Sequence, residues 1–329
     1  MNAPRQLLVL YTGGTLGMQM SADGLAPAGG FDTRLRAEQA AHPERPAPPW
    51  VYRELSPPID SANMTQGHWL AMREAIVAAV ERDGCDAVLL LHGTDTLAYS
   101  AAALSFLLLD LGLPVVLTGA MLPAGAPGSD AWDNLFGALA ALAAGVAPGV
   151  HLYFHGRLLH GARALKRDSA SFDAFAEAQR PRQAPRAAVP ASLDWRRPRR
   201  AVNLAVLPLH PALQAVQVEA LLDSGVEAVL LECYGSGTGP ADDAALLNAL
   251  RRAHRRGVVL AAISQCPQGH IDFATYAAGS RLAACGLVSG GGMTREAALA
   301  KLFALLGAGL EQAEAERWFA VDLCGELAD

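Results

Sequence analysis

Residues 87–96 read AVLLLHGTDT, a short apolar run that leads directly into a polar turn. The run Ala87–Leu91 shows no alternation of polar and apolar residues, which is typical of a strand buried on both faces in a parallel sheet. In the turn that follows, Gly93 allows the backbone to bend, and threonine or aspartate can cap a helix. The stretch therefore predicts one strand–turn–helix unit of an α/β sheet.

The same alternation recurs through the first half of the chain. Further buried strands are predicted at Leu7–Tyr11, Val115–Leu117 and Val150–Phe154, and helices at Thr65–Arg82, Thr96–Leu109 and Asp130–Ala144. Repeated strand–helix alternation favours a parallel sheet with helices on both faces. We expect residues 1–185 to form a larger N-terminal α/β domain with a doubly wound, mostly parallel sheet.

The pattern restarts after a segment rich in proline and arginine. Residues 186–200 are predicted to be a linker, and the arginines within 196–200 are interpreted as solvated rather than as a nucleic-acid patch. Residues 201–329 are predicted to form a smaller C-terminal α/β domain. Its strands are expected at Val202–Leu207, Ala228–Leu231 and Val258–Ile263, and its helices at Asp242–Arg255, Thr294–Leu306 and Leu310–Phe319.

The overall composition argues against several classes of protein. The net charge of −6 gives no general attraction to nucleic acid or to an anionic membrane. The apolar run Leu7–Tyr11 is too short for a secretory signal, and no stretch is long and apolar enough to span a bilayer. The five cysteines have no CxxC spacing, which indicates free thiols rather than disulfides or a zinc site. We therefore predict a cytoplasmic protein.

Two of the predicted strands end in turns that contain both threonine and glycine. One turn is Thr12-Gly13-Gly14-Thr15, and the other is HGTDT at residues 92–96. Ligands of open α/β sheets bind beyond the carboxyl ends of the strands, so two such turns in one domain favour a binding site. Each turn alone is equally compatible with an ordinary helix cap. A nucleotide site is disfavoured, because neither turn contains GxGxxG or the lysine-bearing P-loop pattern.

Lysine is rare in this chain. Of the 26 basic residues, only Lys166 and Lys301 are lysines. Arginine stays protonated at any relevant pH, whereas a lysine can give up its proton and then act as a base. Lys166 follows a predicted strand and is a candidate for that role, although a surface position would explain it equally well. Lys301 is expected on the solvated face of a helix.

Taken together, these residues make a coherent site with a hydroxyl that can be activated. A hydroxyl is a weak nucleophile until a base removes its proton. Lys166 could do this for Thr94, while Asp95 orients the amine or holds the amino group of a substrate. Thr12 would present a second hydroxyl. The backbone N–H groups of its glycine turn and of Gly119-Ala120 could stabilise an oxyanion.

The order of these motifs resembles that of the bacterial-type L-asparaginase family, in particular its cytoplasmic type I branch. The resemblance covers essentially the whole chain. The residues that carry it in the first half are YTGGTLGM at 11–18, DSANM at 60–64, HGTDT at 92–96, LTGAMLP at 117–123, Ser129-Asp130 and Lys166. Those in the second half are YGSG at 234–237, SQC at 264–266 and GGGMT at 290–294.

The resemblance implies the two-domain asparaginase-like fold and hydrolysis of the side-chain amide of L-asparagine, without a cofactor or metal. By matching position, Thr12 would be the first nucleophile, and Thr94, Asp95 and Lys166 the supporting triad. Ser61 and Asp95 would hold the α-carboxylate and α-ammonium of the substrate. The resemblance also implies a homodimer or a dimer of dimers, with each site between the large domain of one subunit and the small domain of its partner. The remaining residues expected to line the substrate pocket are Gly13, Ala62, Gly93 and Ala120.

One departure from the family pattern concerns the loop after the first glycine turn. Many family members carry a tyrosine there that activates the first threonine, whereas this chain has Leu25. The proton of Thr12 must then go to water, to the Lys166 network, or to Tyr234 or Tyr276. Two alternatives to asparagine hydrolysis stay open: action on another small amide such as glutamine, and a non-catalytic amino-acid sensor.

Overall fold

The computed structural model describes residues 3–21, 24–45, 47–178 and 186–327. The chain divides into two compact units, one that extends to Glu177 and one that begins at Ala178. The predicted linker boundaries, residues 186 and 200, are not tested by this division and stay a prediction. In the structure its residues belong to the second unit, in which Leu193 and Trp195 are buried.

The first unit is built on a six-stranded sheet with the strand order β4-β1-β5-β6-β7-β8. All of its strands except β8 run parallel to their neighbours, and the central strands β1 and β5 consist of buried residues. The prediction of a mostly parallel sheet is confirmed. The strands are β1 (Leu7–Gly13), β4 (Trp50–Ile59), β5 (Ala87–Leu91), β6 (Pro114–Thr118), β7 (Gly149–Phe154) and β8 (Arg157–His160).

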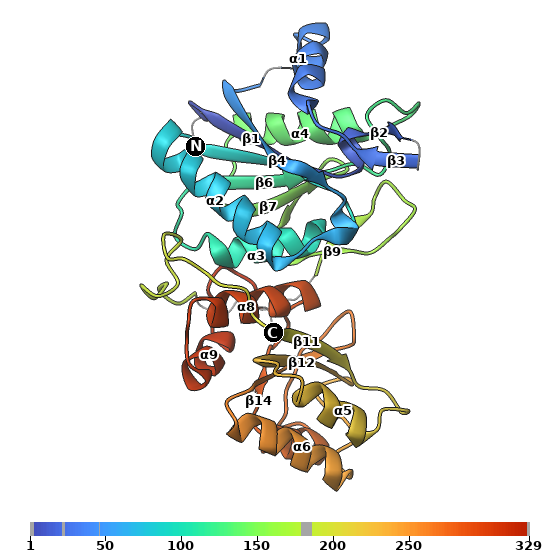
Figure 1. The fold of residues 1–329 in the computed structure, drawn as a ribbon, viewed down its shortest axis with the longest axis vertical. Helices are drawn as coiled ribbons and strands as arrows, with labels where there is room; N and C mark the ends of the chain where they lie inside the picture. Colours follow the sequence, from blue (N-terminus) through green and yellow to red (C-terminus); the bar gives the residue numbers. More distant parts are fainter. Residues whose placement is uncertain (1–2, 22–23, 46, 179–185, 328–329) are drawn as a thin grey trace. The chain divides into compact units, whose positions relative to one another are not determined.

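Helices cover both faces of this sheet. α1 (Phe31–Ala41) and α4 (Ala131–Ala144) lie against one face, and α2 (Gln66–Asp83) and α3 (Leu97–Leu107) lie against the other (Figure 1). α1 and α4 share one apolar cluster with β1, β5 and β6. Because successive residues of a strand point to opposite faces, a strand between two helical layers needs apolar residues at every position. This explains why the central strands are unbroken apolar runs in the sequence.

Two short hairpins accompany the sheet. β2 (Met18–Ser21) and β3 (Gly24–Pro27) pair in antiparallel fashion directly after the 3-10 turn η1 (Thr15–Gly17). β9 (Ala164–Lys166) pairs with β10 (Phe175–Glu177) and has Lys166 at its end. The hairpins therefore carry Leu25 and Lys166, the two residues on which the sequence analysis placed most weight outside the sheet.

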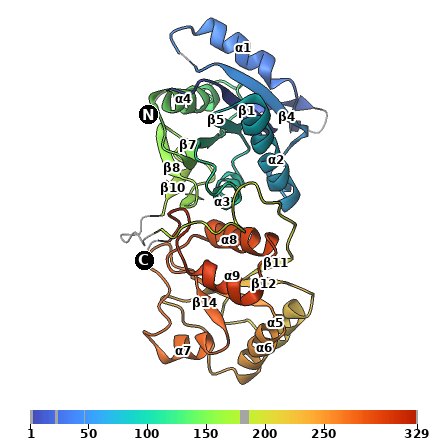
Figure 2. The same ribbon diagram turned by 90° about the vertical axis from the view of Figure 1, so that its left-hand side faces the viewer.

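The second unit contains a four-stranded parallel sheet with the order β11-β12-β13-β14. α5 and α6 pack on one face, and α8 and α9 on the other (Figure 2). The prediction of a smaller C-terminal α/β domain is confirmed. Its elements are β11 (Leu204–Pro208), α5 (Ala215–Leu222), β12 (Ala228–Cys233), α6 (Ala244–Arg255), β13 (Val259–Ser264), α7 (Ala277–Ala283), β14 (Leu287–Ser289), α8 (Arg295–Gly307) and α9 (Gln312–Phe319).

The prediction for Lys301 is wrong. Its side chain on α8 is 0 % exposed rather than solvated. Nζ donates hydrogen bonds to Glu326 Oε1 and to the carbonyl oxygen of Val321, both at 2.5 Å. The residues that follow α9 return to α8 and bury the lysine. Helical periodicity cannot reveal this burial, because the covering residues Val321 and Glu326 lie 20 and 25 residues further along the chain.

None of the helices in the described ranges has both the length and the apolar character that crossing a bilayer requires.

Candidate active site

The predicted motifs of the first unit meet at one edge of its sheet. β1 and β5 are in parallel register with Tyr11 opposite Leu91, so Thr12 near the end of β1 lies beside His92, the first residue after β5. β4 and β6 flank this pair, and the DSANM and LTGAM motifs follow their ends. From β1 the chain runs outward to β4 and then crosses back to β5. The gap between β1 and β5 is therefore the switch point at which ligands of such sheets bind.

Glycines allow these turns to approach one another closely. Gly13 has a φ angle of +111°, and a Cβ atom there would lie 2.4 Å from the carbonyl oxygen of Ile59. A Cβ atom on Gly14 would lie 2.2 Å from the backbone nitrogen of Gly93, and one on Gly93 would lie 2.4 Å from Ser61 Oγ. Any larger residue would push the turns apart. The TGGT, HGTDT and DSANM motifs are thus in direct contact.

Lys166 reaches this edge from the β9–β10 hairpin. Its Nζ lies 3.1 Å from Thr94 Oγ1 and 2.8 Å from Asp95 Oδ1. Thr94 is buried, whereas the Asp95 side chain is 61 % exposed. The ammonium group therefore lies between a buried hydroxyl and a carboxylate on the solvent side. The structure brings together all three residues that were predicted to form the triad.

Thr12 and Ser61 present further hydroxyl groups at the same edge. Thr12 is 1 % exposed, and its Oγ1 donates a hydrogen bond to the carbonyl oxygen of Leu91 at 2.9 Å. Ser61 is buried in the 3-10 turn η2 (Ser61–Asn63). Thr96 Oγ1 donates to the carbonyl oxygen of Ser61 at 2.9 Å and so ties this turn to the HGTDT turn. Ala62 follows in the same turn and is exposed.

Two polar residues at the start of α4 hold the turn that follows β6. Asn134 Nδ2 donates to the carbonyl oxygen of Gly119 at 3.0 Å and to Asp130 Oδ2 at 2.9 Å. The Asp130 carboxylate also accepts hydrogen bonds from backbone N–H groups of the same turn. Ala120 is fully buried. Asn134 could not be identified from the sequence, because an asparagine inside a helical pattern gives no sign of its partner.

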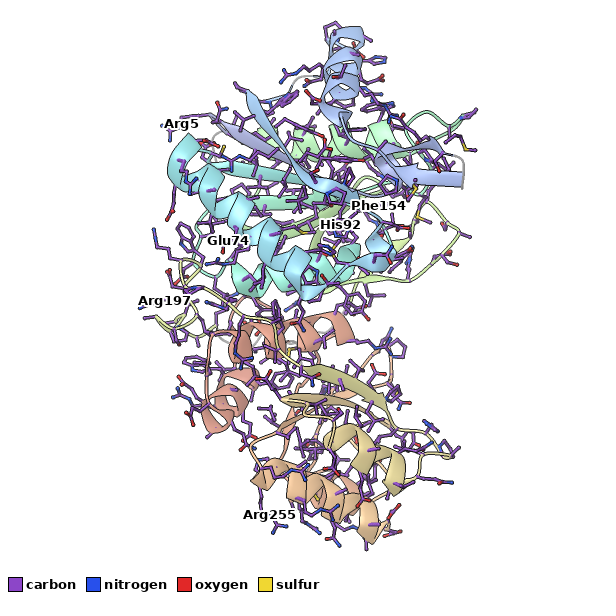
Figure 3. All side chains as sticks on the ribbon, viewed as in Figure 1. Arg5, Glu74, His92, Phe154, Arg197 and Arg255 are labelled. Atoms are coloured by element: carbon purple, nitrogen blue, oxygen red, sulfur yellow. The ribbon has the colours of Figure 1, made fainter. Side chains whose placement is uncertain are left out.

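A buried chain of hydrogen bonds lies directly behind the HGTDT turn. Trp69 Nε1 donates to Ser100 Oγ at 2.9 Å, Ser100 Oγ lies 2.8 Å from His92 Nε2, and His92 Nδ1 lies 2.7 Å from the carbonyl oxygen of Gly93. His92 lies inside the first unit (Figure 3). Burial away from water lowers the pKa of His92 to about 4, so the imidazole is neutral at physiological pH. In the sequence, His92 is recognisable only as part of the HGTDT motif, which gives no sign of its buried partners.

The loop position for which the family resemblance predicts a tyrosine holds an exposed apolar pair. Leu25 on β3 lies opposite Met20 on β2, and both side chains are largely exposed. Tyr11, which precedes Thr12, points elsewhere, because its hydroxyl donates to the carbonyl oxygen of Ala28 at 3.0 Å. Burial also raises the pKa of Tyr11 well above that of a free tyrosine. Tyr11 therefore does not replace the missing loop tyrosine as a base.

Both halves of the chain match models of one protein family. Residues 6–199 match the model described as Asparaginase, N-terminal, and residues 203–319 match the Glutaminase/Asparaginase C-terminal domain. The chain belongs to the asparaginase family. Its relatives include L-asparaginase 1 of Escherichia coli (strain K12), which is 35% identical over 342 residues covering 98% of each chain. They also include the 60 kDa lysophospholipase of Homo sapiens, 35% identical, whose match covers 98% of this chain and 61% of that one.

Solved asparaginase structures have the same fold. L-asparaginase I from Vibrio cholerae superimposes with a TM-score of 0.84 at 32% identity, covering 99% of this chain and 100% of that one. The thermostable L-asparaginase from Thermococcus kodakarensis gives 0.85 at 29% identity, covering 98% of this chain and 99% of that one. The asparaginase fold therefore extends over both units.

The second-half motifs of this asparaginase-family chain also follow strand ends. YGSG, SQC and the glycine run before Thr294 come at or directly after the ends of β12, β13 and β14. Gln265 Nε2 donates to the carbonyl oxygens of Leu209 and Glu232, both at 2.6 Å, and ties two of these ends together. In neither unit do three or more histidine, cysteine, aspartate or glutamate side chains of the described residues gather as metal ligands would.

Proposed function

We propose that this protein is an L-asparaginase, which hydrolyses the side-chain amide of L-asparagine to aspartate and ammonia. One observation carries the proposal: Lys166 Nζ contacts both Thr94 Oγ1 and Asp95 Oδ1, at 3.1 and 2.8 Å, beside the turn that contains Thr12. A hydroxyl, an amine and a carboxylate in sequence are the parts of an activated nucleophile. Family membership and the full-length similarity to L-asparaginase 1 of Escherichia coli support the choice of asparagine.

In the first half of the proposed reaction, Thr12 Oγ1 attacks the carbon of the side-chain amide. A C–O bond forms, the C–N bond breaks, and ammonia leaves with the proton of the hydroxyl, relayed by water or by the Lys166 network. The negative charge that develops on the amide oxygen requires N–H donors. The Thr94 N–H is suited to this role, because no described residue accepts a hydrogen bond from it.

In the second half, water attacks the acyl ester on Thr12 and releases aspartate. Thr94, in contact with Lys166, would accept a proton from that water and pass it to the amine in its neutral form. Asp95 would keep the amine in place through the 2.8 Å contact. Arginine could not serve here, because it stays protonated.

The substrate would be held by groups around this edge. The Oδ1 atom of Asp95 is bound to Lys166, which leaves Oδ2 for the α-ammonium group. Ser61 would donate its hydroxyl to the α-carboxylate. The substrate pocket would be lined by the close-packed residues Gly13, Gly93 and Ala120 and by the exposed Ala62.

An ammonia-release assay tests the proposal and separates it from the alternatives. We expect steady release of ammonia from asparagine, with Thr12→Ala as the inactive control. Release from glutamine at an equal or higher kcat/KM would reassign the substrate to another small amide. Tight binding of asparagine without any turnover would instead support the amino-acid sensor.

We further propose that the protein is cytoplasmic and associates with itself as a homodimer or a dimer of dimers, with no nucleic-acid or membrane partner. The five free thiols suit a reducing compartment. The net charge of −6 favours neither nucleic acid nor an anionic lipid surface. Fractionation of cells that produce the protein would test its location, and retention on nucleic acid or on anionic vesicles would contradict the proposal.

A further inference from the structure

The donors and acceptors behind the HGTDT turn allow only one arrangement of protons. The Gly93 carbonyl can only accept, so His92 Nδ1, 2.7 Å away, must carry a proton. The Trp69 indole can only donate, so Ser100 Oγ accepts from it. A neutral imidazole has a single N–H, and His92 Nε2 therefore accepts the hydroxyl proton of Ser100 at 2.8 Å. Every bond then points the same way, from Trp69 to the Gly93 carbonyl.

We propose that Trp69, Ser100 and His92 form a positioning chain that holds the Gly93–Thr94 peptide in the orientation that amide hydrolysis needs. The inference rests on the function proposed above for Thr94. It gives none of the three side chains a contact with substrate.

The positioning chain acts through the geometry of one peptide unit, the one between Gly93 and Thr94. In a trans peptide the C=O of Gly93 and the N–H of Thr94 point in opposite directions. With the carbonyl bound to His92 in the interior, the Thr94 N–H is directed away from the buried chain, and none of the described groups accepts from it. The same peptide sets the place of Thr94 Oγ1, 3.1 Å from Lys166 Nζ. Aligned hydrogen bonds polarise and strengthen one another, which makes the arrangement rigid.

The surroundings of His92 argue against a role as an acid or a base. The imidazole is 0 % exposed, and both of its nitrogens are engaged within the protein. Its lowered pKa also keeps it neutral across the range in which enzymes usually work. The protons of the Trp69–Ser100–His92 positioning chain therefore stay in place, while those around Lys166 move.

Two substitutions of His92 separate the two ends of the imidazole. The amide of His92→Asn can place its nitrogen near the position of Nδ1 and still donate to the Gly93 carbonyl. The longer side chain of His92→Gln reaches the position of Nε2 and Ser100, but leaves the carbonyl without its donor. We expect kcat to be about tenfold lower in His92→Gln than in His92→Asn, the effect of about one hydrogen bond. KM should change little, because the interaction serves the transition state. Equal kcat values, or a higher one for His92→Gln, would overturn the inference.

Two buried serines on α3 provide a matched pair of substitutions that tests Ser100, the middle member of the positioning chain. Ser100 bonds to Trp69 and His92, whereas Ser105 Oγ donates within the helix to the carbonyl oxygen of Ala101 at 2.8 Å. We expect Ser100→Ala to lower kcat about three- to tenfold and Ser105→Ala to leave it unchanged. Full kcat in Ser100→Ala, with an unchanged melting temperature, would show that the chain has no positioning role.

Nitrogen NMR of the protein labelled with ¹⁵N-histidine reads the tautomer without any need for turnover. The His92 signals, assigned by their loss in His92→Asn, should show the Nδ1–H tautomer and should not titrate from about pH 5 to pH 8. The Nε2–H form, or titration in this range, would refute the inference. An inactive unmutated protein that shows the expected tautomer would contradict only the proposed function. An active protein that tolerates His92→Gln would contradict only the positioning chain.

Discussion

At the scale of the residue, the two lysines show how different the roles of one side-chain type can be. Lys166 is partly exposed and contacts the two polar groups of the site. Lys301 is fully buried and bonded to Glu326. Only the first combines access to solvent with a nucleophile within reach. The scarcity of lysine drew attention to Lys166, whereas Lys301 was wrongly expected on a solvated helix face. The sequence alone could not show that Lys301 is buried.

We expect Lys166→Arg to lose nearly as much activity as Lys166→Met. Arginine keeps the positive charge next to Asp95 but cannot accept a proton from Thr94. On the usual scale of acid–base groups, kcat should fall by about 10² to 10⁴ in both variants. The measurement is steady-state ammonia release. If the arginine variant kept most of the kcat, the lysine would act only as a charge, and the proposed proton transfer would be wrong.

The two threonines should behave as one unit. We expect Thr12→Ala and Thr94→Ala each to be nearly inactive, and the double variant to be little worse than either single one. Groups that act in the same sequence of steps have strongly non-additive effects. A double-mutant cycle on kcat/KM measures this. Losses that multiply in the double variant would show that Thr12 and Thr94 contribute independently.

At the scale of the element, the strands were predictable wherever both faces are buried. Ala87–Leu91 coincides with β5, because two helical layers demand apolar residues at every position. β4 was missed, because it pairs only with β1 at the edge of the sheet and contains Arg53 and Glu54 among its residues. The hairpin that carries Lys166 was not foreseen either, since its strands contain only three residues each.

The meeting of the site residues at one edge of the sheet could be predicted from the same strands. Parallel strands place their carboxyl ends at one edge, so Thr12 and Thr94 were expected there together. The positioning chain could not be predicted from the sequence. Its members Trp69 and Ser100 come from α2 and α3, and their distance from His92 along the sequence follows no helix or strand period.

The β2–β3 hairpin offers a test of the missing tyrosine. Leu25→Tyr would place a phenol on the exposed side of the hairpin, at the position for which the family resemblance predicts an activating tyrosine, and we expect kcat to rise. Proton-transfer groups typically contribute about 10² to 10⁴, so an increase of tenfold or more is within reach. Leu25→Phe is the matched control, with the same ring and no hydroxyl. If both variants gave the same kcat, the proton of Thr12 would have an acceptor other than the hairpin.

The segment that follows α9 should make the stability of the second unit depend on pH. Burial and the neighbouring Glu326 raise the pKa of Asp322 to about 6. Between about pH 4 and 6 the folded chain therefore holds a proton that the unfolded chain has lost. The stabilisation from this group is complete below about pH 4 and disappears as the pH rises through 6.

Asp322→Asn removes this titration. We expect the free energy of unfolding of the unmutated protein, relative to the variant, to fall between about pH 4 and pH 7, as measured by urea denaturation. Asp242→Asn is the control, because that side chain is 92% exposed and should give a difference that does not change with pH. A rise in the Asp322 difference with pH would contradict the direction of the pKa shift.

At the scale of the whole molecule, self-association is the property on which activity should depend. If each site is completed by a partner subunit, as the sequence resemblance implies, activity per subunit should fall on dilution below the dissociation constant. Sedimentation velocity should give at least twice the chain mass of 34.4 kDa at micromolar concentration. A fully active species that sediments as a single chain would show that each subunit is sufficient by itself.

The near absence of lysine also has a consequence for anyone who wishes to attach this protein to something. Lys301 is 0 % exposed, so Lys166 is the lysine that an acylating reagent of moderate strength can reach. Conjugation through amines should therefore inactivate the enzyme one-for-one as Lys166 is acylated, and saturating aspartate should protect it. Dyes, polymers or resins are better coupled through carboxylates, which are numerous, or through Cys266, whose thiol is free and exposed.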